Sequence, residues 1–449
     1  MREQFVEKSQ IQYVIEGINK LYDHMIKNAR IDAAEMKVFL EPYFTEAGYR
    51  DELNSSKAKN KSKSKSNIVI LHDAGVGDFI LMSAVIREIR RTYPKAYISL
   101  MINRFAKDMA EFCPYVDEVI PSKDSVLIKS DDFFNFYKTI SDIVKPLLRR
   151  KIDVIFNFGH YPSSQLLAYM SGAKERVDLN YIGNAVQEIK AGNIPGSIFA
   201  DLSTFHFDWR DFKGSHYNER FLYILHKYSK TQVSNKALEL WINPVDKFEA
   251  KEKLQSISDK KIYAIVPGGN IKLACKRWSA ENYSKLMNII LDEESVAFII
   301  LGGIEDVENA KFIKSTVKTE NILDFTNKLN YRQSAAILNL CDCYIGNDTG
   351  LMHAAAALNI PILTPNCFPS DKNMNVSSLP ALYYPYNVPS VTVQPKQSLD
   401  ECKTSNSSVG CSKNEPHCIN QISPATMFEG LALLNKRIAK GEREPLFFN

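Results

Sequence analysis

Short apolar runs alternate with longer amphipathic stretches along most of the chain, beginning at Asn67. In the first half the runs read NIVILHD, AYISLMIN, VDEVIP and IDVIFNF, and GDFILMSAVIREIRRTYP and SSQLLAYMSGA have helical spacing. This alternation is typical of parallel βαβ units. The pattern therefore predicts a Rossmann-like domain over residues 67–240.

A second series of the same kind begins at KIYAIVPGG. Its further apolar runs are VAFIILGG, NILDFT, CDCYIGN and IPILTP, with the helical stretches AENYSKLMNIILDE and YRQSAAILNL between them. It predicts a second Rossmann-like domain over residues 241–420. We expect an α/β fold whose two domains face each other across a cleft, with ligands at the carboxyl ends of the strands.

The two ends of the chain differ from this pattern. Residues 1–66 combine helical apolar spacing with the lysine-rich stretch NSSKAKNKSKSKSN, which indicates a helical extension and a linker. The linker is interpreted as a solvated tether, with a surface for acidic lipid headgroups as the alternative. Residues 421–449 predict a last helix that starts at Ser423 and Pro424 and packs back across the cleft.

Composition agrees with a two-domain soluble protein. The chain has 449 residues, of which 45% are hydrophobic and 24% charged. A net charge of +4 is too small to indicate nucleic acid as the main partner. Apolar runs stay well below the roughly 18 residues of a membrane span, and the amino end lacks the apolar region of a secretion signal. These features predict a cytoplasmic protein.

The eight cysteines show no pairing pattern, which favours a reducing compartment. Cys402, Cys411 and Cys418, with His417 beside the last, are separated by eight and six residues. This spacing is not the C-x-x-C of a zinc ribbon, so reduced thiols are preferred over a metal site. Whether these three cysteines bind anything stays open.

The stretch GNDTGLMHA, residues 346–354, lies between an apolar strand and an Ala-rich helix. The helix is expected to start at Thr349 or Gly350. The first turn of a helix presents unpaired N–H groups and the positive end of the helix dipole, a combination that binds anions. The turn is therefore predicted to hold phosphate.

The first glycine turn, HDAGVGDFIL, argues against a nicotinamide cofactor. Ile80 stands where G-x-G-x-x-G requires its third glycine, and Asp78, directly after Gly77, would repel a pyrophosphate. A carboxylate that a helix N-terminus keeps ionised suits a general base. The alternative for Asp78 is an ordinary acid of a helix cap or first turn.

Two loops of the second half carry further charged residues. After the Gly268–Gly269 turn come Lys276 and Arg277, cations that would offset a diphosphate at the same sheet edge, unless they are simply solvated. After LGG come Glu305 and Asp306. A carboxylate there can accept hydrogen bonds from both ribose hydroxyls, or it can be an ordinary acid of a helix N-terminus.

Together these loops resemble glycosyltransferase family 9, the ADP-heptose:lipopolysaccharide heptosyltransferase type, over about residues 67–435. The resemblance rests on GDFILMSAVIREIRRTYPKAYI, on PGGN followed by KRWSAENYSKL, on LGG followed by acids, and on GNDTGLMHAAAALNIP. Weaker matches are SSQLLAYMSGAKERV, HYNERFLYIL and CSKNEPHCINQISPATM. The sequence differs from the family at His72-Asp73-Ala74 and in its amino-terminal extension, and both differences leave the acceptor open.

The resemblance implies a GT-B fold and an inverting transferase without a metal ion or separate cofactor. It would move heptose from ADP-heptose to a hydroxyl of lipopolysaccharide core or a related glycan. Its partners would be a nucleotide sugar and a lipid-linked or glycan acceptor at the inner membrane face, with a homo-oligomer possible. Transfer to protein hydroxyls and use of another nucleotide sugar remain alternatives.

The resemblance also assigns roles to residues of this chain. Asp78 would be the catalytic base, with Gly77 beside it at the acceptor. Apart from the resemblance, two loops rich in aromatic residues suit stacking on sugars and pairing with phosphates, so acceptor contacts are also expected from His160 and Arg210. Asp306, or as second choice Glu305, would bind the donor ribose. The remaining donor-site residues would surround the diphosphate: Lys276, Asp348, Thr349, Gly350, Leu351, His353, Gly268 and Gly269.

Overall fold

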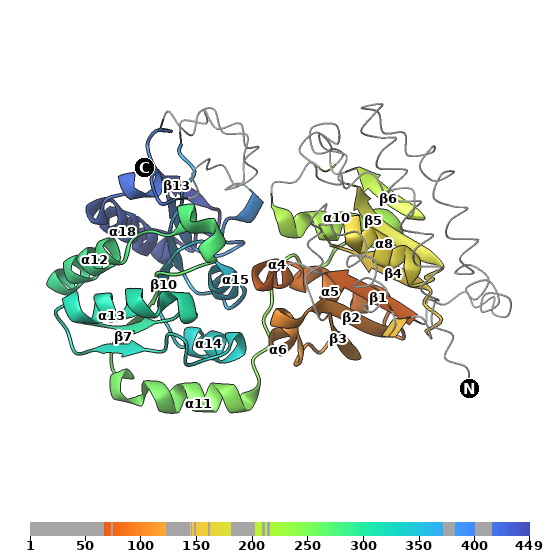
Figure 1. The fold of residues 1–449 in the computed structure, drawn as a ribbon, viewed down its shortest axis with the longest axis horizontal. Helices are drawn as coiled ribbons and strands as arrows, with labels where there is room; N and C mark the ends of the chain where they lie inside the picture. The colour runs from red at the N-terminus through yellow and green to blue at the C-terminus, as the bar shows by residue number, and fades with distance from the viewer. Residues whose placement is uncertain are drawn as a thin grey trace, which may run out of the picture. The chain divides into compact units, whose positions relative to one another are not determined.

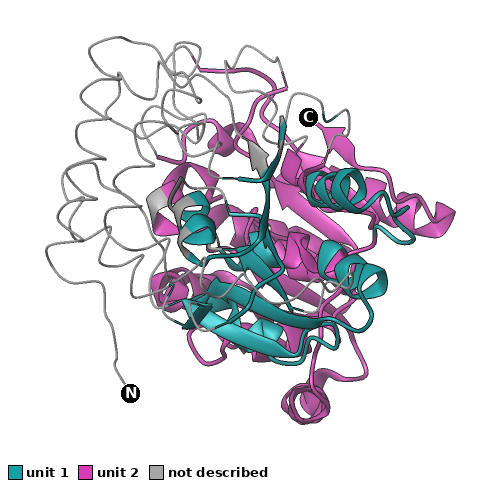
Figure 2. Ribbon diagram, turned by 90° about the vertical axis from the view of Figure 1, so that its right-hand side faces the viewer, with its two compact units in different colours: residues 1–79, 85–214, 218–236 teal, residues 80–84, 215–217, 237–449 magenta. Residues whose placement is uncertain are grey.

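The computed structural model of the chain contains two compact units, shown in different colours in Figure 2. The second unit starts at Ala237 and also includes residues 80–84 and 215–217. The predicted domain boundary at residues 240 and 241 lies close to this change. The structure describes residues 67–72, 75–122, 144, 146–147, 150–159, 162–180, 203–208, 212, 216–370, 382–399 and 415–449.

The first unit is built around a parallel sheet of six strands in the order β3-β2-β1-β4-β5-β6 (Figure 1). The chain first builds outward from β1 to β3 and then crosses back to continue from β4, so the strand order reverses between β1 and β4. The strands are β1 (Asn67–His72), β2 (Tyr97–Asn103), β3 (Glu118–Ser122), β4 (Val154–Asn157), β5 (Glu175–Asn180) and β6 (Phe205–Asp208).

The amphipathic stretch after β1 forms two helices instead of one. Helix α4 ends at Leu81 and α5 begins at Ser83, on either side of Met82. The side chain of Met82 is buried, as are Ile86 and Ile89 on the inner face of α5. The helices that lie between and after these strands along the chain are α4 (Val76–Leu81), α5 (Ser83–Thr92), η1 (Arg104–Ala106), α6 (Lys107–Ala110), α8 (Pro162–Met170) and α10 (Tyr217–Ser229).

The second unit repeats this plan with seven parallel strands in the order β13-β12-β11-β10-β7-β8-β9. The order reverses between β7 and β10. The strands are β7 (Lys261–Val266), β8 (Val296–Ile300), β9 (Ile322–Asp324), β10 (Cys343–Gly346), β11 (Ile362–Pro365), β12 (Ser390–Val393) and β13 (Leu446–Phe448). The helices are α11 (Pro244–Leu254), η4 (Gln255–Ile257), η5 (Ile271–Lys276), α12 (Ala280–Glu293), η6 (Ile304–Asp306), α13 (Val307–Thr316), α14 (Tyr331–Leu338), α15 (Gly350–Ala357), η7 (Ile419–Gln421) and α18 (Pro424–Lys440).

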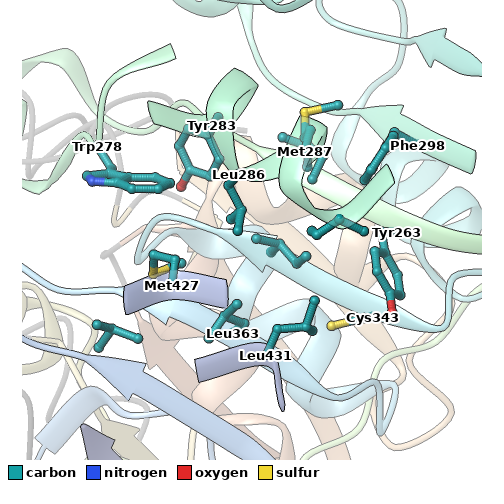
Figure 3. Close-up of a cluster of buried hydrophobic side chains, with 14 of the residues drawn as sticks. Tyr263, Trp278, Tyr283, Leu286, Met287, Phe298, Cys343, Leu363, Met427 and Leu431 are labelled. Atoms are coloured by element: carbon teal, nitrogen blue, oxygen red, sulfur yellow. The ribbon is translucent and has the colours of Figure 1, made fainter. Parts of the chain in front are cut away.

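Both faces of the second sheet are buried, which explains the continuous apolar runs of its strands. All residues of β8 and β10 are buried. One large cluster of buried side chains contains Trp278, Tyr283 and Phe298 and reaches from α12 across the strands to α18 (Figure 3). Because Trp278 and Tyr283 belong to this core, the loop before α12 is fixed to the body of the unit.

The last helix packs on its own unit. Helix α18 contacts β11, β12 and α12, and β13 after it extends the second sheet. Ser423 caps this helix through a hydrogen bond from the amide of Thr426, as the sequence predicted. These contacts lie within the second unit, where a row of buried apolar residues, Met427, Leu431 and Leu434, faces the sheet. The predicted packing of this helix across a cleft stays a prediction.

Each predicted apolar run contains a strand, from β1 to β4 and from β7 to β11. The first sheet and the first six strands of the second have the strand order of a Rossmann fold. The predicted α/β chain with two Rossmann-like domains is therefore confirmed. The predicted helical extension and linker, residues 1–66, lie outside the described residues.

Candidate functional site

The second sheet brings two glycine-containing turns together where its strand order reverses. Val266, the last residue of β7, pairs with Gly346, the last residue of β10. The turn after β7 contains Gly268 and Gly269, and the turn after β10 contains residues 347–349. In doubly wound sheets, ligands bind at the carboxyl ends of strands at this reversal. The structure thus places both predicted turns at one expected ligand site.

Asn347 joins these turns through four hydrogen bonds of its buried side chain. Its Oδ1 accepts from the amide of Trp278 at 3.1 Å and from the hydroxyl of Tyr283 at 2.8 Å. Its Nδ2 donates to the carbonyls of Pro267 at 2.8 Å and Gly268 at 3.0 Å. Every donor and acceptor of the carboxamide is used, so Asn347 fixes the β7 turn, the β10 turn and the start of α12 relative to one another.

Tyr344, fully buried on β10, supports the other side of the same turn. Its hydroxyl donates to the carbonyl of Asn347 at 2.7 Å and lies 3.3 Å from Oγ1 of Thr349. Thr349 is the N-cap residue of α15. Gly269 approaches from the β7 turn: its φ is +147°, and an added Cβ would lie 3.2 Å from Cγ2 of Thr349. Glycine is therefore the residue that fits there.

Helix α15 begins at Gly350, as predicted, and its first turn can bind an anion. The amides of Gly350 and Leu351 lie in the first turn, where no intrahelical acceptor exists. The side chain of Thr349 makes no cap hydrogen bond to these amides. The positive end of the helix dipole adds to their attraction for negative charge.

Lys276 brings a cation to this helix start. Its Nζ lies 2.8 Å from Oδ2 of Asp348, while Oδ1 of Asp348 lies 3.9 Å from Nε2 of the buried His353. Burial alone would lower the pKa of Lys276, but the charge of Asp348 and its hydrogen bond outweigh burial and raise the pKa to about 12. Lys276 is therefore charged at any physiological pH, and Asp348 holds it beside the first turn of α15.

Asp306 is part of the supporting structure behind the turns. Its Oδ1 accepts from Arg277 at 2.5 Å, and its Oδ2 accepts from the amide of Gly303 at 2.9 Å. Arg277 also donates to the carbonyl of Gly269 at 2.5 Å. A Cβ added to Gly268 would lie only 2.0 Å from Oδ2 of Asp306, so that turn needs glycine.

Glu305, next to Asp306 on η6, is exposed. Tyr331, at the start of α14, lies close to both acids: partial burial and the charges of Glu305 and Asp306 raise its pKa. The two neighbouring acids, which the sequence treated as alternatives, thus have different surroundings. Asp306 is buried and paired, whereas the carboxylate of Glu305 is available to a ligand.

Asp78 lies in the first turn of α4 in the other unit and is half-buried. Its Oδ2 accepts a hydrogen bond from the amide of Gly75 at 3.2 Å. This contact matches the alternative reading of a first-turn acid, and it also orients the carboxylate. Gly77 is the residue before it on the same helix. His160 and Arg210 lie outside the described residues.

No cluster of metal-ligating side chains occurs among the residues that the structure describes. Cys418 is buried, whereas Cys402 and Cys411 fall outside those residues. Within the same part of the chain, no helix has the length and apolar character needed to cross a bilayer.

Sequence reasoning missed Asn347, Tyr344 and the structural role of Arg277. An asparagine beside glycine and aspartate looks like an ordinary turn residue. The available signal was its position directly after a buried strand, where an amide side chain can reach the neighbouring turn. Tyr344 was predicted only as part of an apolar strand, since nothing in the sequence shows where its hydroxyl points.

Replacing Asn347 by alanine is expected to destabilise the second unit by about 3 kcal/mol, because it leaves buried partners without hydrogen bonds. Those partners are the Tyr283 hydroxyl, the Trp278 amide and two carbonyls. Chemical denaturation of wild type and variant measures the difference. Asn339→Ala, at the exposed end of α14, is the matched control and should change little. Equal stability of the two variants would contradict the role given to Asn347.

Comparison with known proteins shows which family the chain is similar to. The family model of glycosyltransferase family 9 (heptosyltransferase) matches residues 204–365, a range that includes both turns, Lys276 and the start of α15. Lipopolysaccharide heptosyltransferase 2 of Escherichia coli is 20% identical over 302 residues, which cover 66% of this chain and 81% of that protein.

Solved structures show the same fold. A glycosyltransferase family 9 protein from Veillonella parvula aligns with a TM-score of 0.65 and 18% identity, covering 84% of this chain and 99% of that one. The E. coli heptosyltransferase WaaC with ADP aligns with a TM-score of 0.54 and 13% identity, at the same coverage of both chains. These similarities confirm the predicted GT-B fold class. In sequence and in fold the chain is thus similar to the heptosyltransferases of glycosyltransferase family 9.

Proposed function

We propose that this glycosyltransferase transfers heptose from ADP-heptose to a hydroxyl of lipopolysaccharide core or a related surface glycan, with inversion at the anomeric carbon. The observation that carries the proposal is the position of Lys276 beside the first turn of α15, held there by Asp348 at 2.8 Å. The choice of substrates is supported by the E. coli relative, a lipopolysaccharide heptosyltransferase, and by the solved heptosyltransferase with ADP.

The diphosphate of the donor would bind at the amides of Gly350 and Leu351, with Lys276 alongside. As the bond between the anomeric carbon and the diphosphate breaks, negative charge builds on the leaving oxygen. The amides, the helix dipole and the ammonium group are already in place, so they stabilise this charge without reorganisation. We propose that these groups supply the positive charge that other transferases obtain from a divalent cation, and that no further cofactor takes part.

Asp348 has a second role in this scheme. In the free protein it neutralises Lys276 and keeps it ordered, and after donor binding the ammonium would be shared between Asp348 and a phosphate oxygen. His353, 3.9 Å from Asp348, lies on the inner side of the same helix turn and completes this wall of the pocket. The residues predicted to surround the diphosphate would therefore act together as one charged group.

The donor ribose is assigned to Glu305 in preference to Asp306, which reverses the order expected from the sequence. Both oxygens of Asp306 already accept hydrogen bonds, from Arg277 and from the amide of Gly303. Binding a ribose there would break the ion pair that holds the Gly268–Gly269 turn. Glu305 is exposed and would accept from the two ribose hydroxyls without this cost.

Asp78 would remove the proton from the acceptor hydroxyl as that oxygen attacks the anomeric carbon. A carboxylate oriented by a backbone amide and half-exposed in a helix first turn suits this task. The acceptor is expected to be lipid-linked and to reach the enzyme at the cytoplasmic face of the inner membrane.

Replacing Asp78 by asparagine is expected to lower kcat about a thousandfold, because the base is lost, while ADP binding is unchanged. The assay measures ADP release from ADP-heptose with and without a lipid A-core acceptor, with calorimetry for ADP affinity. Asp108→Asn, another acid of a helix first turn in the same unit, is the matched control. If Asp78→Asn turned over as fast as wild type, Asp78 would not be the base. If wild type released ADP at the same rate with and without the acceptor, the proposed acceptor class would be contradicted.

The two acids of η6 should respond differently to amide substitution. Glu305→Gln is expected to raise the KM for the donor severalfold and leave the melting temperature unchanged, since Glu305 is exposed. Asp306→Asn should lower the melting temperature, since it leaves the partly buried Arg277 without its charged partner. Steady-state kinetics and thermal denaturation of both variants test the assignment. If instead Asp306→Asn raised the KM for the donor and Glu305→Gln lowered the melting temperature, the ribose would be assigned to Asp306.

The pH dependence of ADP binding tests the ion pair. Because the pKa of Lys276 is raised to about 12, its charge is present below its ordinary value of 10.5 and is lost only as pH rises through the higher value. In Asp348→Asn burial would instead lower the pKa, so affinity for ADP should fall with rising pH between about pH 8 and 10, where wild type stays flat. Calorimetry across this range measures both curves, and parallel curves would contradict the pairing.

A further inference from the structure

An exposed aromatic ring stands at the carboxyl end of β2, in the unit that is expected to bind the acceptor. Phe105 keeps 61% of its accessible surface, although large apolar side chains are usually covered. The guanidinium of Arg104 lies 4.9 Å from the centre of its ring. With one face beside Arg104, a ring this exposed must present its other face and its edges to solvent.

The backbone that carries this ring is fixed. Phe105 lies in η1, and its amide donates to the side chain of Asn103 at 3.1 Å, the cap of this short helix. Asn103 is buried, as is Ala106 on the inner side of the turn. Two residues after Phe105, the side chain of Lys107 is exposed. The ring is thus held at a defined place on the sheet, with Arg104 beside it and the exposed Lys107 two residues later in the chain.

This place is the sheet edge where Asp78 also lies. His72 at the end of β1 pairs with Ile102 near the end of β2, and the two strands run parallel. The loop that leads to Asp78 and the turn that carries Phe105 therefore leave neighbouring strands at the same edge. In α/β sheets this is the edge at which ligands bind.

An exposed aromatic ring beside cations matches one kind of ligand. The C–H face of a sugar ring packs on an aromatic ring, and guanidinium and ammonium groups pair with carboxylates or phosphates. We propose that Arg104, Phe105 and Lys107 form an acceptor subsite for a sugar residue that carries a negatively charged group. The inference rests on the proposed function, because it assumes a glycan acceptor that reacts near Asp78.

The test compares acceptor and donor kinetics of Phe105→Ala with those of wild type. The KM for a lipid A-core acceptor is expected to rise about tenfold, with the donor KM and kcat at saturating acceptor unchanged, because only acceptor binding is weakened. Phe105→Trp should keep the wild-type acceptor KM, since it retains an aromatic face. Arg104→Ala should raise the KM for phosphorylated or carboxylated acceptors but not for a neutral oligosaccharide.

Phe248→Ala is the matched control. Phe248 lies on α11 in the other unit and is 65% exposed, close to the exposure of Phe105, so it tests the effect of removing an exposed phenylalanine in general. Its acceptor KM should equal that of wild type. Melting temperatures of all variants check that each is folded.

The outcomes separate the inference from the proposed function. If wild type shows no acceptor-dependent transfer, the proposed function fails, whatever the variants do. If wild type transfers and Phe105→Ala keeps the wild-type acceptor KM, the subsite is overturned. If light scattering shows a wild-type dimer that Phe105→Ala dissociates, with acceptor KM unchanged, the ring belongs to self-association and the inference is also overturned.

Discussion

The geometry of the donor site depends on one buried carboxamide. Asn347 uses all of its hydrogen-bonding capacity to join the turn after β7, the turn after β10 and the start of α12. Trp278, whose amide donates one of these bonds, is itself held in the core by a hydrogen bond from its indole N–H to the carbonyl of Ile422. The two glycine turns are therefore tied to the apolar core (Figure 3), and the start of α15 has a fixed position before any ligand arrives.

The charged side chains near the start of α15 then determine what this site can bind. An aspartate beside an anion site looks unfavourable, because Asp348 opposes the charge of a phosphate. Its effect on Lys276 explains its presence: the ion pair keeps the lysine charged although it is largely buried, and aims it at the helix start. The second ion pair, between Arg277 and Asp306, supports the Gly268–Gly269 turn. The carboxylate of Asp306 occupies the space in which a Cβ at position 268 would lie.

The features that the sequence predicted correctly are those that depend on the local pattern of residues. Apolar runs located the strands, Ser423 marked a helix start that the structure confirms, and the glycine turn before the Ala-rich helix indicated an anion site. It could not separate Glu305 from Asp306, because the difference comes from Arg277, 29 residues away along the chain. It also missed Asn347, whose four partners lie 64 to 80 residues earlier. Such long-range side-chain contacts leave no periodic signal in a single sequence.

The most direct test of the donor site is a crystal structure of this protein with ADP. The phosphates are expected within hydrogen-bonding distance of Nζ of Lys276 and of the amides of Gly350 and Leu351, with the ribose hydroxyls at Glu305. Phosphates bound away from the start of α15, with the pair of Lys276 and Asp348 undisturbed, would contradict this placement of the diphosphate.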